Sequence, residues 1–226
     1  MCLVAVIETG TQTNTWRRCL ADETPDAIDA CTAIIVLNPQ SDGALVNRGI
    51  AYRRNGDVER AIRDYETAIR LNPAAADAFN NRGNAFRAKE KFDLAIRDYD
   101  EAIRLNPHYA HAFNNRGIVF LDIGEPDRAI LDFDRAIAED DSYANAFRNR
   151  GIASTHLGLF DRALDDFDAA FALNPAIGHG DEYALALYGR GVARQRESDP
   201  AGDADIEEAT RLLPHVAEMV SGIEDP

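Results

Sequence analysis

Small and polar residues recur along this chain at a fixed spacing. The tripeptide Asn-Arg-Gly begins at four positions, each 34 residues after the last: Asn47, Asn81, Asn115 and Asn149. Asn-Pro pairs keep the same step at Asn38, Asn72, Asn106 and Asn174, and Asp140-Asp141 fills the remaining place. A repeat of this length indicates a stack of similar supersecondary units rather than one layered domain.

Within each unit the pattern predicts two antiparallel helices. Counted from Asp42, Ala76, Ala110 and Ala144, the eighth position is glycine, the twentieth is alanine and the twenty-fourth is aromatic. Helices approach closely only where facing residues are small, and large residues then fill the flanks of the contact. We expect the first helix at positions two to fourteen, then a turn, then a second helix that the Asn-Pro pair stops.

The recurring small, aromatic and proline positions resemble the tetratricopeptide repeat, in the Asn-Arg-Gly form seen in bacteria. The resemblance covers about residues 42–177 and implies an all-α fold, a right-handed superhelical solenoid of helix hairpins. It divides the chain into an N-terminal segment with a degenerate capping repeat (1–41), four full repeats (42–75, 76–109, 110–143, 144–177), and a degenerate fifth repeat with an inserted loop and a C-terminal capping helix (178–226).

Turns and ends depart from the pattern in a few places. Glu90 stands where the other turns have glycine, which should weaken that turn. Upstream, a degenerate second helix is expected at about 26–37. Downstream, six inserted residues around 177–182 read as a longer connection, and 216–223 reads as a closing helix that covers the last hairpin.

An arginine and an aspartate also recur in register. The arginines at the seventh position are Arg48, Arg82, Arg116, Arg150 and Arg190, and the acids at the twenty-third are Asp64, Asp98, Asp132, Asp166 and Asp205. A guanidinium can meet a carboxylate through two parallel hydrogen bonds. We expect structural pairs within each hairpin rather than an anion-binding arginine ladder.

In the resembled fold the first helices line the concave face, where the sixth position is asparagine in all four full repeats: Asn47, Asn81, Asn115 and Asn149. A carboxamide can bond both the N–H and the C=O of a bound peptide. The pattern is similar to the asparagine ladder of O-linked N-acetylglucosamine transferase, and implies readout of a peptide backbone. The alternative is that these side chains only bond neighbouring helices.

Further partner-binding residues are expected on the same face: Asn80, Asn84, Asn114, Arg53, Arg87 and Arg148. The first-helix segments carry nine basic and two acidic residues. The second-helix segments carry nine basic and seventeen acidic residues. A mildly basic groove would favour the encounter with an acidic peptide. The carboxylate clamp of chaperone-tail binders is not expected, because only Arg148 fits its basic positions.

Charge and hydropathy exclude other partners. The net charge of -15 opposes binding to a phosphate backbone, and no apolar run reaches the roughly 20 residues of a membrane helix. As written, the chain shows no export signal, which favours the cytoplasm. A periplasmic or secreted location follows if an upstream signal has been removed.

Cys19 and Cys31 resemble the paired cysteines of exported bacterial tetratricopeptide proteins, which makes a disulfide an open alternative. It would stabilise the degenerate hairpin by about 2 to 3 kcal/mol and would indicate an oxidising compartment. Strict repeat register opposes the bond, because it separates the two positions by several helical turns unless the first helix ends early.

No motif for catalysis, a cofactor or a metal is present. The histidines lack further ligands, although the inserted 178–182 stretch could form a small polar site. We expect a non-enzymatic scaffold that binds a protein or an extended peptide along the concave face. The alternative is a structural module that assembles with copies of itself.

Overall fold

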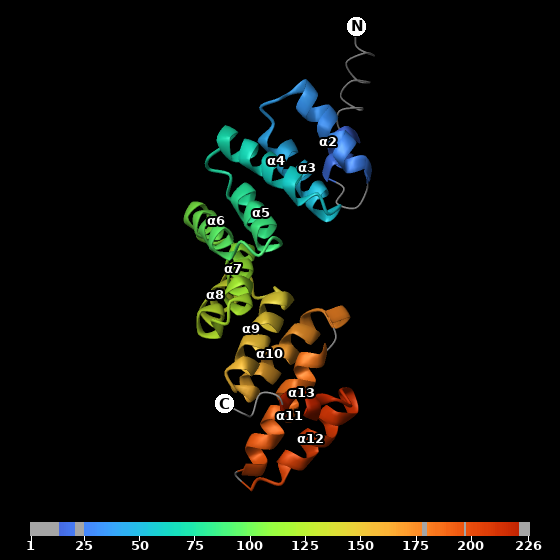
Figure 1. Ribbon diagram of the computed structural model, residues 1–226, viewed down its shortest axis with the longest axis vertical. Coiled ribbons are helices and arrows are strands. Elements are labelled where there is room, and N and C mark those ends of the chain that lie inside the picture. The colour runs from blue at the N-terminus through green and yellow to red at the C-terminus, as the bar shows by residue number, and fades with distance from the viewer. Residues whose placement is uncertain (1–13, 21–24, 178–179, 197, 222–226) are drawn as a thin grey trace. The chain divides into compact units, whose positions relative to one another are not determined.

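The structure is a computed structural model that describes residues 14–20, 25–177, 180–196 and 198–221. Every regular element in these ranges is a helix, so the expected all-α class is confirmed (Figure 1). The chain forms two compact units, residues 1–108 and 109–226.

The first unit consists of helix hairpins packed in succession. A short helix at 14–20 precedes α2 (Pro25–Leu37), α3 (Asp42–Arg54), α4 (Val58–Leu71), α5 (Ala76–Arg87) and α6 (Phe92–Leu105). The helix α3 pairs with α4 and α5 pairs with α6, while the first helices α3 and α5 also touch one another. The helices begin and end within a residue or two of the predicted positions.

The second unit continues the same plan. It contains α7 (Ala110–Asp122), α8 (Pro126–Glu139), α9 (Ala144–His156), α10 (Phe160–Leu173), a short 3-10 helix (Pro175–Ile177), α11 (Gly180–Arg196), α12 (Ala201–Leu212) and α13 (Val216–Ser221). The closing helix α13 packs on α11 and α12 and buries Val216 completely. It therefore covers apolar surface of the last hairpin, as a capping helix should.

One expectation at the C-terminal end is wrong. The insertion around 177–182 is not simply a longer connection, because Gly180, Asp181 and Glu182 form the first turn of α11. The added residues lengthen that helix at its N-terminus, where acidic side chains are favourable. Residues 178 and 179, including His179, lie outside the described residues.

Each full hairpin closes where a glycine of the first helix meets an aromatic ring of the second. A Cβ added at Gly49 would lie 2.5 Å from Cε1 of Tyr65, and the same contact recurs at Gly83, Gly117 and Gly151. The rings of Tyr65, Tyr99 and Phe133 are fully buried. The small residue is therefore what allows the two helices to pack at this distance.

The predicted arginine–aspartate pairs are confirmed in all five hairpins. Arg48 donates from Nε and Nη2 to the two carboxylate oxygens of Asp64 at 2.7 and 2.8 Å. Equivalent two-bond pairs join Arg82 to Asp98, Arg116 to Asp132, Arg150 to Asp166 and Arg190 to Asp205. The arginine in α9 also bonds the preceding hairpin, since Arg150 Nη1 donates to Asp134 Oδ1 at 2.6 Å.

Replacing Glu90 by glycine should stabilise the protein. Glu90 has φ 55°, in the left-handed region where Gly56, Gly124 and Gly158 occupy the other turns. A side chain costs about 1 kcal/mol in this region, and glycine avoids that cost. We expect Glu90→Gly to raise the free energy of unfolding by about 0.5 to 1 kcal/mol in urea titrations. Gly124→Ala, the reverse change in an equivalent turn, should lower it, and equal signs for the two variants would contradict this account.

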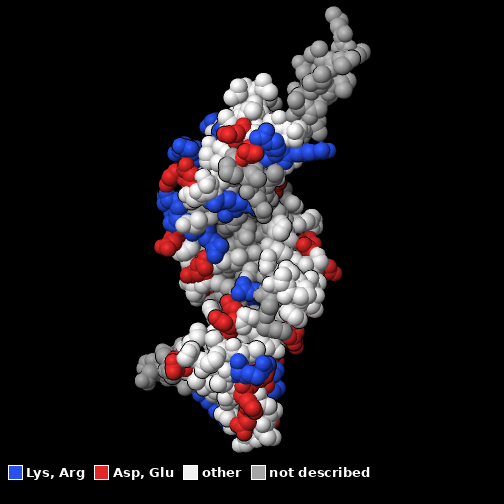
Figure 2. All heavy atoms as spheres, turned by 90° about the vertical axis from the view of Figure 1, so that its right-hand side faces the viewer, with Lys and Arg blue, Asp and Glu red and all other residues white. Residues whose placement is uncertain are grey.

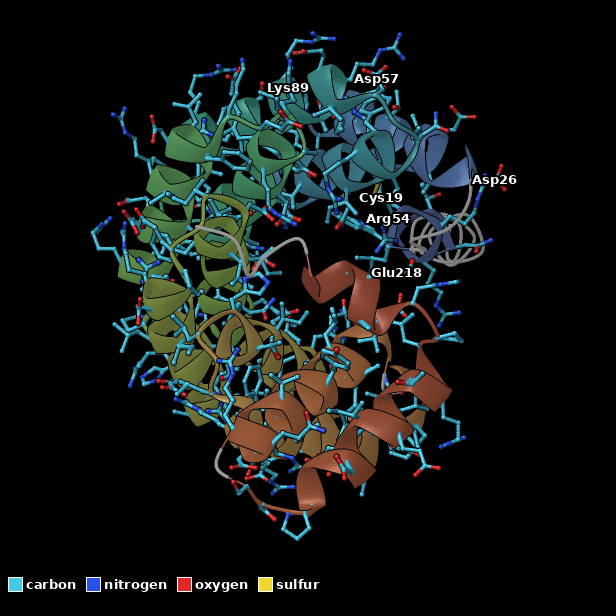
Figure 3. The ribbon with its side chains drawn as sticks, turned by 60° about the horizontal axis from the view of Figure 1, so that its bottom comes forward. Cys19, Asp26, Arg54, Asp57, Lys89 and Glu218 are labelled. Atoms are coloured by element: carbon cyan, nitrogen blue, oxygen red, sulfur yellow. A yellow bond between two sulfur atoms is a disulfide. The ribbon has the colours of Figure 1, made fainter. Side chains whose placement is uncertain are left out.

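A disulfide joins Cys19 to Cys31 and links the helix at 14–20 to α2 (Figure 3). The Cα atoms are 4.8 Å apart. Both residues are buried in a small cluster with Ala30, Ile34 and Ala44. The bond therefore fastens the helix at 14–20 to α2, in a cluster that includes Ala44 of the first full hairpin.

Candidate partner-binding surface

The predicted binding residues lie on the first helices of the hairpins, α3 and α5 in the first unit and α7 and α9 in the second. We call the outward side of these helices the first-helix face. In each unit the first helices are neighbours: α3 touches α5, and α7 touches α9. Side chains at the same repeat position on two such helices can therefore act on one ligand.

In the first unit, Asn47 and Asn81 are half-buried at the same position of α3 and α5. Asn81 donates from Nδ2 to the carbonyl oxygen of Asp77 at 2.9 Å, a bond within its own helix. Its Oδ1 receives no hydrogen bond from any described residue, and within the same ranges the Asn47 carboxamide has no side-chain partner. Both groups thus keep hydrogen-bonding capacity for a ligand.

Two expected surface residues are not on the surface. Asn80 is 5% exposed and Asn114 is 3% exposed. Asn114 Oδ1 accepts a hydrogen bond from Asn149 Nδ2 at 2.9 Å, a contact between α7 and α9. The burial of both side chains contradicts their expected place on the binding face.

The second unit uses its predicted residues differently. The bond from Asn149 to Asn114 joins α9 to α7, which is the alternative role that the sequence left open. Asn115 is half-buried on α7. Arg148 pairs with Glu182 at the start of α11, with Nη2 to Oε1 at 3.0 Å. The lengthened α11 therefore neutralises the one arginine that fitted a basic clamp position.

Asn84 has a structural partner of its own. It is half-buried on α5, and its Oδ1 accepts a hydrogen bond from the hydroxyl of Tyr99 at 2.9 Å. In the preceding hairpin, Ile50 occupies the position of Asn84, and Tyr65 that of Tyr99. The Tyr65 hydroxyl is buried and lacks the carboxamide partner that Tyr99 has, and the polar group beside it is the guanidinium of Arg53.

Arg53 lies beside this hydroxyl, in the last turn of α3. Its Nε is also buried without a hydrogen-bond partner in the described part of the chain. Burial raises the pKa of Tyr65 to about 12, while the positive charge of Arg53, its side-chain hydrogen bond to the hydroxyl and the charge of Arg54 act in the opposite direction. Sequence reasoning selected Arg53 but missed its contact with Tyr65, and the spacing of the repeats carries no signal for it.

This difference predicts unequal results for two similar substitutions. Tyr99→Phe removes a hydrogen bond of 2.9 Å and leaves the Asn84 oxygen without it, so it should lower the free energy of unfolding by about 1 kcal/mol. Tyr65→Phe removes a hydroxyl whose neighbour is the guanidinium of Arg53 rather than a carboxamide, so the loss should be smaller. Urea unfolding of both variants measures this, and equal losses would contradict the comparison.

The remaining predicted residue, Arg87, lies half-buried in the last turn of α5, at the position equivalent to Arg53. In α7 and α9 the same position is Leu121 and Thr155, so basic side chains here belong to the first unit alone. Residues 1–108 include fourteen basic and sixteen acidic residues. Residues 109–226 include ten basic and twenty-three acidic residues. Lys and Arg side chains gather over the first unit in Figure 2. The basic part of the first-helix face therefore lies in the first unit.

A shallow hollow of about 520 Å³ lies away from these asparagines, between the turn of the first hairpin and the end of α5. Gly56, Asp57 and Glu59 line it with Lys89, which forms an ion pair with Glu59. Asp57 and Lys89 are labelled in Figure 3. The paired charges and open shape do not define a ligand.

The described residues support neither a metal site nor a membrane-spanning helix. These residues bring together no group of three or more His, Cys, Asp or Glu that could hold a metal ion. None of the helices seen there is both long and apolar enough to cross a membrane.

A family model described as tetratricopeptide repeat matches residues 46–110, 80–145 and 114–176. These matches together span more than half of the chain, and the hairpins follow the same period. The chain belongs to the tetratricopeptide repeat family. This family typically supplies non-catalytic scaffolds, which supports a protein-interaction scaffold in general.

Solved structures agree with the fold. The chain is similar to YrrB, a tetratricopeptide protein with an unusual peptide-binding site, at 23% identity and TM-score 0.68, covering 86% of this chain and 99% of that one. It is similar to MamA at 27% identity and TM-score 0.58, covering 67% and 88%. The first tetratricopeptide domain of Spaghetti (RPAP3), solved with an HSP90 peptide, gives 24% identity and TM-score 0.50, covering 52% and 94%. A search of curated proteins finds no match.

Proposed function

We propose that this chain is a scaffold that binds an extended peptide segment of a partner protein along the first-helix face of its first unit. The observation that carries the proposal is the pair of carboxamides on α3 and α5. Asn47 has no side-chain partner among the described residues, and Asn81 keeps a free Oδ1 there. The peptide-binding relatives of the same fold, YrrB and the RPAP3 domain, support this function.

The spacing of the two asparagines suits a peptide backbone. Neighbouring packed helices lie about 10 Å apart, and an extended chain advances about 3.3 Å per residue. One carboxamide on each helix therefore meets the backbone at about every third residue. Each carboxamide can bond one peptide unit without regard to its side chain, so sequence preference must come from other residues of the face.

Peptide selection followed by substitution tests the proposal. A displayed library of random nine-residue peptides is selected on the full chain, and the affinity of recovered peptides is measured by fluorescence anisotropy. Replacing Asn47 and Asn81 together by alanine should weaken binding at least tenfold, whereas Asn55→Ala, in the adjacent turn, should not. Failure to recover any peptide, or equal affinity for the double variant, would refute this function.

Self-assembly is the second candidate, and one observation favours it. Val36 and Leu37 at the end of α2 are 74% and 77% exposed, with Leu20 of the preceding helix at 59%. Such apolar side chains could pack on a second copy of the chain. Analytical ultracentrifugation decides this point. A chain that stays monomeric at all concentrations rejects self-assembly. A dimer that also forms when Asn47 and Asn81 are replaced by alanine supports it.

A further inference from the structure

The second unit departs from the repeat pattern at the place where α9 begins. The turn before α9 carries Asp140 and Asp141, whereas Asn-Pro stands at this place in the other full repeats. Tyr109 and Tyr143 are the N-cap residues of α7 and α9, a position that is serine before α3 and alanine before α5. His111 follows in α7, where α3 has glycine and α5 has aspartate. Because the other hairpins fold without these side chains, the repeat itself does not require them.

The three rings and the first of the two carboxylates form a cluster. The ring centroids of His111 and Tyr143 are 4.7 Å apart, those of Tyr109 and His111 are 6.2 Å apart, and both pairs meet at 81°. His111 is exposed, and both tyrosines are half-buried. Burial raises the pKa of Tyr143 to about 12, and the nearby charge of Asp140 acts in the same direction. The tyrosine ring and the carboxylate therefore lie near one another.

Asp140 keeps its negative charge and one unused oxygen. Its Oδ1 accepts hydrogen bonds from the backbone N–H and the hydroxyl of Ser142, at 3.0 and 2.6 Å. These bonds hold the pKa of Asp140 below its usual range, and His111, when protonated, acts in the same direction. Within the described part of the chain, Asp140 Oδ2 receives no hydrogen bond. A charged oxygen of this kind forms strong hydrogen bonds with a cationic N–H donor.

The ring of Tyr143 also lacks the cation that several other rings of the chain have. Cζ of Arg128 lies 3.9 Å from the centroid of the Phe120 ring, and Cζ of Arg60 lies 5.5 Å from that of Tyr52. No Lys or Arg among the described residues lies over Tyr143 in this way. Lys and Arg cations are attracted to the face of an aromatic ring within about 6 Å. The ring and the carboxylate thus both have room for a cation that the described chain does not supply.

The charge of the second unit favours the same kind of ligand. Residues 109–226 include ten basic and twenty-three acidic residues, and this excess attracts basic partners. We propose that Tyr143 and Asp140, with His111 beside them, form a binding site for a lysine or arginine side chain of a partner protein. The cation lies over the tyrosine ring and donates a hydrogen bond to the unused carboxylate oxygen. This site is separate from the proposed peptide-binding face of the first unit and does not depend on it.

An NMR titration of ring signals tests the site. The full chain is labelled with ¹³C in its tyrosine and histidine rings, and the Tyr143 signals are assigned by their loss in Tyr143→Ser. The probe is a short glycine-serine peptide with one central arginine and capped ends. It should shift the signals of Tyr143 and His111, while the same peptide with glutamine in place of arginine should not. Equal shifts from the two peptides, or no shift from either, would overturn the proposal.

Two aspartate variants separate a specific site from general attraction to an acidic surface. Asp140→Asn should weaken the response to the arginine peptide about fivefold. The turn should persist, because asparagine accepts the same turn hydrogen bond at Asn72 and Asn106. Asp165→Asn removes an exposed carboxylate from α10 and changes the net charge equally, so the response should stay the same. Equal weakening by both variants would mean that net charge alone attracts the peptide, and would reject the site.

Peptide selection tests the site in recognition of a partner. With the carboxamides of the first unit removed by Asn47→Ala and Asn81→Ala, the full chain should recover displayed peptides enriched in Lys or Arg. Adding Tyr143→Ser should abolish this enrichment. Peptides without a basic preference, or a preference that survives Tyr143→Ser, would overturn the proposal. Either result would leave peptide binding by the first unit untouched, since that face is disabled in both variants.

Discussion

Replacing Gly49 by alanine is expected to destabilise the protein by about 1 to 3 kcal/mol, although alanine is the better helix former. The new Cβ would lie 2.5 Å from Cε1 of Tyr65, far inside van der Waals contact. The Tyr65 ring is fully buried and cannot move aside without displacing its neighbours. To make room for the new Cβ, α3 and α4 would have to move apart. The free energy of unfolding measured in urea should therefore fall.

Gly43 provides the matched control, because it lies in the same helix. A Cβ there would have no neighbour within 4 Å. Gly43→Ala should therefore raise stability by up to about 1 kcal/mol through helix propensity alone. If both glycine variants changed stability in the same direction, close packing of Gly49 against Tyr65 would not be what holds the hairpin together.

Removing the carboxylate of Asp98 is expected to cost about 2 to 4 kcal/mol, because it leaves a half-buried arginine without its partner. Arg82 donates two hydrogen bonds to Asp98, each 2.8 Å long. Glu101, in the same helix, pairs with Arg104 at the exposed surface. Asp98→Ala should shift the urea midpoint strongly, and Glu101→Ala should leave it unchanged within error.

A double substitution separates the value of the pair from the cost of breaking it. Burial raises the pKa of Asp98 even though the hydrogen bond from Arg82 acts to lower it, which shows how much desolvation opposes the charged form. Replacing Arg82 by methionine and Asp98 by leucine together should therefore recover most of the stability lost in Asp98→Ala. If the double variant were as unstable as Asp98→Ala, the ion pair would stabilise the hairpin in its own right, and the loss in Asp98→Ala would not come only from leaving Arg82 without its partner.

The hairpins could be predicted from the sequence because their defining contacts lie at constant separations. Gly49 contacts Tyr65, and Arg48 pairs with Asp64, at the same spacing of 16 residues. The contacts of one repeat therefore predict the equivalent contacts in the others. The burial of Asn80 and Asn114 could not be predicted in this way, because it depends on the packing of neighbouring hairpins. The same holds for the ion pair between Arg148 and Glu182, which exists because the insertion extends α11.

The candidate site was therefore predicted in part. The carboxamides of Asn47 and Asn81 occupy neighbouring first helices, as the period requires. The different partners of the two tyrosine hydroxyls, Arg53 for Tyr65 and Asn84 for Tyr99, emerge only when the hairpins are compared in the structure, since the sequence shows a tyrosine at the same position in both. A repeat protein makes this comparison possible, because one hairpin serves as the control for the next.

The most direct test of peptide binding through the first-helix face is an NMR titration of asparagine side chains. The full chain is labelled with ¹⁵N at asparagine, and a selected peptide is added while the carboxamide signals are followed. Binding through the first unit predicts that the signals of Asn47 and Asn81 shift together and saturate, while that of Asn55 stays in place. A bound peptide that leaves the Asn47 and Asn81 signals unchanged would contradict the account.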